Sequence, residues 1–281
     1  MASVNEYLNF AVDLNSPETI SSYDELPLWS ALFGLLLLKH VPLRQDMQVL
    51  DVGCGTGFPL LELAQRLGST SEVYGIDPWA SAIYRAKQKA QAWNVRNVDV
   101  RQGDAVSMPF ADGQFDLIVS NLGINNFTNP QAALAECWRV SKSSGKIALT
   151  TNLQGHMQEF YDVFEATLVD IGNEQAVNAL KRHIAHRATM DGIAALFEKT
   201  GFRLSKVHAE STTMCFVDAS AFLRHYFIKL GFMDGWKNVV DENDREVVFD
   251  RLEENLNNYA RAQGELVLTI PIAYIEGEKV Q

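Results

Sequence analysis

Short apolar runs alternate with segments of helical spacing between residues 47 and 151. Helical segments show apolar positions three and four residues apart, whereas strands buried in a parallel sheet are apolar throughout. This alternation predicts βαβ units and a parallel sheet. We expect strands at 47–52, 73–77, 98–105, 115–121 and 147–151, and helices at 60–67, 81–93 and 130–141; Arg85, Lys87 and Lys89 are expected on the exposed face of the second helix.

The later part of the chain continues this pattern. A helix over 192–200 ends at Gly201, and strands follow at 202–207 and 265–274. Alone, these patterns support five or more strands, mostly parallel. Residues 152–190 and 211–260 predict further helices, which in an α/β fold commonly supply a lid and a substrate pocket. We divide the chain into an N-terminal helical cap (1–46), a core (47–151) and a remainder of the sheet with helical insertions (152–281), within one structural domain.

The most informative segment joins the first predicted strand to the first predicted helix. It reads VLDVGCGTG at 49–57, and its glycines at 53, 55 and 57 permit positive φ and a close approach of a ligand to the backbone. Pro59 suits the first turn of the helix that follows. Free N–H groups at that helix start favour an anionic or polar group. Asp51 is a polar residue that a buried strand would not carry without a partner.

Residues around the turn discriminate between cofactors. The dinucleotide fingerprint G-x-G-x-x-G requires glycine at 58, where this chain has Phe58. Asp77 ends the next strand 26 residues after Asp51, about where a ribose needs a hydroxyl acceptor. Asp104 follows the third strand and can accept from an adenine amino group. Three carboxylates at successive strand ends fall on the edge where open parallel sheets bind ligands.

At this point the chain resembles the class I S-adenosylmethionine-dependent methyltransferases, in the branch that includes ubiquinone/menaquinone and arsenite methyltransferase-like enzymes. The resemblance covers residues 47–151 closely and rests on VLDVGCGTG, on GID at 75–77, on GDAVSMPFADGQFD at 103–116 and on ALAECWRVSKSSGKIAL at 133–149. It implies a seven-stranded, mostly parallel, Rossmann-like α/β sheet with a reversed last hairpin and helices on both faces.

The same resemblance assigns roles to the motif residues. Gly53, Gly55 and Gly57 would face the methionine part of S-adenosylmethionine, and Asp51 would position the turn and the methionine amino group. Asp77 would hold both ribose hydroxyls, and Asp104 with Ala105 would bind adenine. We add Pro78, Trp79 and Asn121 to the cofactor site. Trp79 is expected to flank adenine, and the loop that starts at Asn121 is expected to face the sulfonium.

Structural alternatives stand beside these assignments. The glycine turn fits a tight turn without a ligand, and Asp77 or Asp104 taken singly fits a helix N-cap. Their joint placement at three strand ends favours the cofactor. Asn125 and Asn126 serve either as substrate contacts or as turn-forming residues. The loop lacks the N-P-P-Y-like stretch of amine-directed nucleic-acid methyltransferases, which disfavours a base or a protein glutamine as acceptor.

Composition narrows the function further. The net charge of −11 argues against nucleic acid as a partner. The longest apolar run, 31–38, is shorter than the ~20 residues of a membrane span, and the first residues carry no basic segment, so we expect a cytoplasmic protein without a secretion signal. Three cysteines at 54, 137 and 215 have no metal spacing, which fits a reducing cytosol and disfavours arsenic as acceptor. We expect no metal.

The candidates for the chemistry are three histidines and one tyrosine. His156, five residues past the fifth strand, is our first choice for a general base; the alternative is a solvent-facing histidine at a helix start. His183 and His186 are expected on one face of a helix. This face either reaches an acceptor or is exposed to solvent together with Arg182 and Arg187. Tyr23 either closes over the cofactor from the cap or packs as an aromatic anchor with Trp29. Residues 222, 226, 227, 232 and 236 form an aromatic stripe with the spacing of a core.

The sequence therefore predicts a methyltransferase that acts on a small molecule, as a monomer or homodimer. Methyl transfer from a sulfonium is an in-line displacement, so the protein mainly positions the acceptor and excludes water. The alternatives are a methyltransferase for a protein or carrier-bound substrate, a non-catalytic S-adenosylmethionine-binding protein and a dinucleotide oxidoreductase.

Overall fold

The computed structural model describes residues 6–24 and 28–280. Contacts group the chain into two compact units. The sheet unit contains residues 13–152, 188–210 and 272–281, and the helical unit contains residues 1–12, 153–187 and 211–271. The predicted boundary after residue 151 lies beside the crossing at 152–153. The predicted cap is divided between the units, because residues 6–12 belong to the helical unit and the described residues from 13 onward to the sheet unit.

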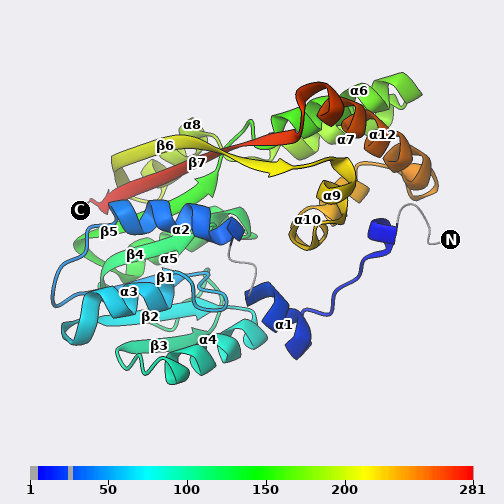
Figure 1. Ribbon diagram of the computed structural model, residues 1–281. Coiled ribbons are helices and arrows are strands. Elements are labelled where there is room, and N and C mark those ends of the chain that lie inside the picture. Colours follow the sequence, from blue (N-terminus) through cyan, green and yellow to red (C-terminus); the bar gives the residue numbers. More distant parts are fainter. Residues whose placement is uncertain (1–5, 25–27, 281) are drawn as a thin grey trace. The chain divides into compact units, whose positions relative to one another are not determined.

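The described residues form a seven-stranded sheet in the order β3-β2-β1-β4-β5-β7-β6 (Figure 1). Strands β1 to β5 pair in parallel, and β7 runs antiparallel to β5. The predicted α/β class, with a mostly parallel sheet and a reversed end, is confirmed. The strands are β1 (Gln48–Val52), β2 (Glu72–Asp77), β3 (Val98–Gln102), β4 (Phe115–Asn121), β5 (Ser141–Asn152), β6 (Phe202–Phe216) and β7 (Leu266–Lys279).

The register of the sheet explains why the acidic residues gather. Asp51 pairs with Gly75 between β1 and β2, and Asp77 pairs with Gln102 between β2 and β3. The carboxyl ends of these parallel strands are therefore nearly level. The buried positions of β1 lie on both faces of the strand, as expected for a strand inside a covered sheet.

Helices flank the sheet between its strands. Among them, α2 contacts β4 and β5, α3 contacts β2, α4 contacts β2 and β3, and α5 contacts β5 (Figure 1). Helix α3 buries Leu60, Leu63 and Leu67, which recur at intervals of three and four residues. The helices of this unit are α1 (Pro17–Asp24), α2 (Leu28–His40), α3 (Leu60–Leu67), α4 (Ala80–Ala92), α5 (Pro130–Val140) and α8 (Met190–Lys199), with 3-10 turns η2 (Gly68–Thr70) and η3 (Gly123–Asn125).

The helical unit has its own aromatic core. Phe160, Phe164, Phe222 and Trp236 are fully buried there, and the Phe160 and Trp236 rings lie 4.2 Å apart between centroids. The core packing predicted for Phe222 and Trp236 is confirmed. The unit contains η1 (Glu6–Asn9), α6 (Gln158–Ile171), α7 (Glu174–Ala185), α9 (Ala219–Arg224), α10 (Tyr226–Gly231), α11 (Met233–Lys237), η4 (Glu242–Asp244) and α12 (Arg245–Gln263).

Some predicted bounds are corrected. β3 ends at Gln102 rather than 105, because Asp104 and Ser107 form a separate bridge. β5 begins at Ser141 directly after α5, and β6 continues to Phe216. Among the described residues, no helix is long and apolar enough to cross a membrane.

Candidate cofactor site

The glycine turn, residues 53–57, presents bare backbone at the end of β1. Its glycines have φ values of 80°, 50° and 102°, a region that side chains disfavour. The amides of Gly53 and Cys54 donate to the Ile76 carbonyl of β2, which fixes the turn against the sheet. A Cβ built on Gly55 meets no atom within 4 Å, so open space lies over this residue. The turn thus offers a backbone surface that a ligand can approach closely.

Two close contacts explain the local sequence around the turn. A Cβ on Gly75 would lie 2.6 Å from a Leu60 methyl carbon, so the GID strand needs glycine for α3 to approach β2. A Cβ on Gly34 would lie 2.3 Å from the Phe58 ring. Phe58, which replaces the last glycine of the dinucleotide pattern, therefore packs its ring against α2.

Asp51 is the most unusual group in the turn region. It is fully buried, and among the described residues only the Leu60 amide interacts with its carboxylate, in a contact too loose to be a regular hydrogen bond. Burial and then the negative charge of Asp77 raise its pKa to about 8, while the Leu60 amide lowers it only partly. A buried carboxylate is costly without a partner. Asp51 is therefore suited to a cationic ligand group at the carboxyl end of β1.

Asp77 is held by the backbone on both oxygens. Oδ2 accepts from the Gly55 amide at 2.9 Å, and Oδ1 accepts from the Trp79 amide at 2.8 Å. Burial raises its pKa, and these two amides oppose the rise. Each carboxylate oxygen has a second lone pair, so the group can accept two further hydroxyl donors. Its oxygens are thereby oriented for a vicinal diol.

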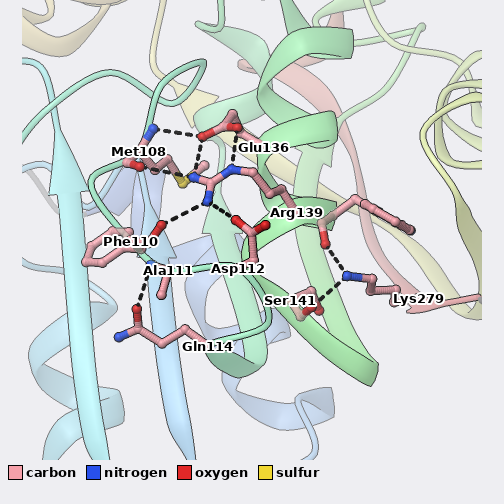
Figure 2. Close-up of polar contacts among 10 residues, drawn as sticks. Met108, Phe110, Ala111, Asp112, Gln114, Glu136, Arg139, Ser141 and Lys279 are labelled. Atoms are coloured by element: carbon pink, nitrogen blue, oxygen red, sulfur yellow. Dashed lines mark hydrogen bonds and ion pairs between the residues drawn. The ribbon is translucent and has the colours of Figure 1, made fainter.

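The segment after β3 is fixed from α5. Glu136 accepts from the Met108 amide at 2.9 Å, and Arg139 donates to the carbonyls of Met108 and Phe110 (Figure 2). Arg139 also pairs with Glu136 at 2.7 Å and with Asp112 at 2.6 Å (Figure 2). This network holds the chain just beyond the predicted adenine residues.

Within that segment, Asp104 is exposed and Ala105 is buried. The Val106 amide donates to the Asp104 carboxylate at 3.1 Å. One carboxylate oxygen of Asp104 thus stays open to a further donor.

Asn121 and the loop behind it serve the structure of the sheet unit. Asn121 donates to the Ser30 carbonyl at 3.0 Å and accepts from the Thr150 hydroxyl at 2.7 Å, so its amide joins α2 to β5. Asn125 donates to Asn152 and accepts from Thr151. These contacts support the turn-forming alternative for Asn125, and the cofactor role of Asn121 stays a prediction.

Helix α1 brings Tyr23 to the segment that follows β2. The Tyr23 ring packs edge-on against Trp79 with centroids 5.3 Å apart, and the Trp79 indole donates to the Leu14 carbonyl at 2.9 Å. Burial and then the charge of Asp77 raise the pKa of the Tyr23 hydroxyl. Tyr23, Trp79 and Asp77 therefore lie together, whereas Pro78 between them is exposed. Trp29 packs on Phe33 instead.

Sequence reasoning missed the charges that hold α1. Asp24 pairs with Arg85 and Lys89 of α4, so these two cations are not on a free face as predicted; only Lys87 is exposed there. The signal was present as two basic residues four apart on one helix. Their acidic partner is 65 residues away from Lys89, which the local pattern does not reveal. Glu136 and Arg139 were also missed as holders of the segment after β3.

His156 lies in the helical unit and is buried, 2% exposed, so the solvent-facing alternative is wrong. Its ring stacks on Phe232 with centroids 5.5 Å apart. Burial and then the positive charge of Arg187 lower its pKa to about 3. Near neutral pH the ring is uncharged, and a base with so low a pKa takes a proton only weakly. The role of general base stays a prediction that this environment does not favour.

His183 and His186, also in the helical unit, have different surroundings. His183 lies 3.3 Å from the Tyr161 hydroxyl, which accepts from the Trp236 indole at 3.1 Å. His186 follows the last residue of α7, is exposed, and contacts the Arg182 carbonyl through Nδ1. The two rings therefore do not form one shared surface. Among the described residues, no group of three or more potential metal ligands converges.

Comparison with known proteins agrees with this geometry. Residues 43–201 match the family model described as methyltransferase domain. A demethylmenaquinone methyltransferase of Anoxybacillus flavithermus is 27% identical over 174 residues, which cover 59% of this chain and 73% of that protein. A 2-phytyl-1,4-naphtoquinone methyltransferase of Trichormus variabilis is 33% identical over 144 residues, which cover 49% of this chain and 63% of that protein.

A solved structure shares the fold. The YcgJ protein of Bacillus subtilis superposes with a TM-score of 0.59 at 17% identity, over 89% of this chain and 99% of that one. Since the family model spans more than half of the chain, this protein belongs to the methyltransferase domain family. The predicted enzyme class and the predicted family are thereby confirmed.

Proposed function

We propose that this enzyme binds S-adenosylmethionine at the glycine turn and transfers its methyl group to a small-molecule acceptor. The observation that carries the donor assignment is Asp51, buried at the end of β1 with no regular hydrogen bond to either carboxylate oxygen and only a loose contact to the Leu60 amide among the described residues. The ammonium group of the methionine moiety supplies the charge and the donors that this carboxylate requires. The open space over Gly55 admits that moiety beside the backbone.

The remaining contacts follow the geometry of the strand ends. Asp77, oriented by the amides of Gly55 and Trp79, accepts from the two ribose hydroxyls. Asp104 and Ala105 take adenine, with Trp79 and Pro78 beside it, on the segment held by Arg139. Tyr23 covers the ribose side, next to Asp77.

The bound donor supplies an activated methyl group on a sulfonium, so the chain need not activate it. The residues of the site act by orientation. Asp51 and Asp77 anchor opposite ends of the donor, and the apolar residues around the turn exclude water. An acceptor held in line with the sulfur–methyl bond then needs a proton-accepting group only if its nucleophilic atom is protonated.

We propose a quinone-type ring, in its reduced form, as the acceptor. The two relatives above are named for demethylmenaquinone and for 2-phytyl-1,4-naphtoquinone. A reduced ring carries electron-rich carbon next to a hydroxyl, which makes it a nucleophile toward a sulfonium methyl group: the carbon–methyl bond forms as the sulfur–methyl bond breaks, and the ring carbon then releases its proton to solvent. We place the reaction in the cytoplasm, a compartment in which the three free thiols of this chain are stable.

Two measurements test this function. Calorimetry should show binding of S-adenosylhomocysteine and no binding of NAD, and affinity for NAD instead would contradict the donor assignment. Incubation with S-adenosylmethionine and a water-soluble naphthoquinol should give a product heavier by one methylene in mass spectrometry. Donor binding with no methylation of any quinol would refute the acceptor class and retain the donor.

A further inference from the structure

Helix α1 is short and has little apolar contact to hold it. It has eight residues, of which only Ile20 is buried. Helices of this length are unstable alone, so their position depends on tertiary contacts. The contacts that hold α1 at its end are ionic.

Asp24, the last residue of α1, joins two cations of α4. Its Oδ2 lies 2.9 Å from Arg85 Nε, and its Oδ1 lies 2.7 Å from Lys89 Nζ. The side chains of Asp24 and Lys89 are 9% and 13% exposed, so water screens this pair less than an ordinary surface pair. Both carboxylate oxygens are engaged at once, which fixes the end of the helix in position and in rotation.

A further contact of Asp24 reaches the glycine turn. The hydroxyl of Thr56, which lies between Gly55 and Gly57, interacts with the same carboxylate and helps to lower its pKa. Burial alone would raise the pKa of Asp24, but Lys89, Arg85 and Thr56 together lower it. The carboxylate is therefore charged near neutral pH, and it links α1, α4 and the turn.

The neighbouring residue is the one that meets the ribose side. Tyr23 precedes Asp24 directly, and burial and then the charge of Asp77 raise the pKa of its hydroxyl. Its ring rests on Trp79, whose indole holds the chain at Leu14, before α1 begins. Helix α1 is thus attached at both ends to the segment that follows β2, and Tyr23 lies between the attachments.

We propose that Asp24 is a positioning residue: its ion pairs with Arg85 and Lys89 hold α1 so that Tyr23 covers the ribose of the bound donor. This inference rests on the proposed function. Opening of α1 precedes release of the spent product, so the ion pairs set the rate of that release. A state in which α1 is released binds the donor less tightly, and apparent affinity falls with the fraction of closed chains.

The substitution Asp24→Asn tests the proposal. We expect the dissociation constant of S-adenosylhomocysteine to rise about tenfold, almost entirely through faster dissociation in stopped-flow displacement. Added salt should speed dissociation more from the wild-type protein than from the variant, because the variant has lost the Asp24 ion pairs that salt screens. Asp24→Glu should restore part of the slow dissociation.

A double variant links the effect to α4. Lys89→Gln should also speed dissociation. The effect of the double variant, Asp24→Asn with Lys89→Gln, on the dissociation rate should be smaller than the two single effects combined, because both changes remove one shared interaction. Additive effects would show that the two residues act separately and would overturn the proposal.

Asp116 is a matched control in the same unit. It lies near the start of β4, away from the carboxyl ends of the strands, and pairs with Arg44 and Lys142, each at 2.7 Å. Its side chain is 10% exposed, as covered as that of Asp24. Asp116→Asn should lower stability without changing ligand dissociation. An equal change in both variants would show a general loss of stability and would contradict the positioning role.

Hydrogen exchange separates this inference from the proposed function. In the ligand-free protein, Asp24→Asn should speed amide exchange in residues 17–24, while exchange in α3 stays the same. Unchanged amide exchange in α1 would show that the ion pairs of Asp24 do not hold this helix, and this result would not depend on which ligand the protein binds. Failure of the wild-type protein to bind S-adenosylhomocysteine would instead refute the proposed function.

Discussion

At the scale of single residues, Asp51 combines a stability cost with a function. Its pKa is raised to about 8, so the folded chain takes up a proton there that the unfolded chain releases near pH 4. Stability therefore falls as pH rises through the interval between these values. Residues that destabilise the free protein in this way are typical of binding sites.

The variant Asp51→Asn should separate the two effects. At pH 8 we expect a gain of roughly 1–3 kcal/mol in the free energy of unfolding, since an uncharged amide replaces a buried charge. Affinity for S-adenosylhomocysteine should fall at least 100-fold, because the ammonium group loses its counterion. Urea unfolding at pH 5 and pH 8, with calorimetry, measures both. Lower stability at pH 8 would contradict the buried charge.

Gly55 gives a second prediction at this scale. Its φ of 50° and the open space above it mean that Gly55→Ala adds a methyl group where we propose that the donor binds, with a strain of about 1 kcal/mol. Donor affinity should fall at least tenfold. Gly172, in the left-handed α region with a φ of 76° and with nothing within 4 Å, is the matched control. Gly172→Ala should cost similar stability in thermal unfolding and leave binding unchanged; equal binding in both variants would contradict a ligand at Gly55.

At the scale of elements, α5 supports the segment after β3 through the side chains of Arg139 and Glu136. Arg139 contacts two carbonyls and two carboxylates, and its planar guanidinium makes these contacts at once (Figure 2). The connection between β3 and β4 thereby becomes a fixed surface rather than a free loop. The position of residues 104–112 therefore depends on α5, and the position of α5 depends on its packing against β5.

Replacement by lysine should reveal this dependence. Arg139→Lys keeps the charge but offers one ammonium group in place of the planar fork, so residues 104–112 should exchange amide protons faster. We expect affinity for S-adenosylhomocysteine to fall about fivefold, measured by calorimetry, with a smaller loss in thermal stability. Arg66→Lys, at an exposed pair with Glu62 on α3, should change neither. Binding equal to wild type in Arg139→Lys would show that the segment holds its own shape.

At the scale of the whole molecule, the sheet and its ligand edge followed from local patterns. Each of these features has a signal within a few consecutive residues: the apolar run of a buried strand, the glycine turn and the carboxylate at a strand end. Parallel pairing then brings the turn and the carboxylates to one edge of the sheet. The remaining features depend on contacts between distant segments. Asp24 meets Lys89, and Gly34 meets Phe58, across separations that no periodicity marks. The burial of His156 depends in part on Phe232, far along the chain.

The two units should respond to pH in opposite directions. In the helical unit, burial lowers the pKa of His156 to about 3, and lowers those of His183 and His225. The unfolded chain then binds protons first as pH falls below about 6.5, so this unit loses stability toward acid. In the sheet unit, Asp51 has the opposite sign and favours the fold as pH falls from about 8. The lowered pKa of His40, which lies in the same unit, has the opposite effect, because this residue lowers the stability of the sheet unit as pH falls.

Hydrogen exchange, corrected for intrinsic rates and read separately for each unit, measures this difference between pH 5 and pH 8. His156→Phe keeps a ring against Phe232 and should reduce the loss of protection of the helical unit at pH 5, with the sheet unit unchanged. Asp51→Asn should remove the Asp51 contribution from the sheet unit only, leaving the slope that His40 produces. A change of equal size in both units for either variant would mean that the chain unfolds as one cooperative body, and the separate pH responses would be refuted.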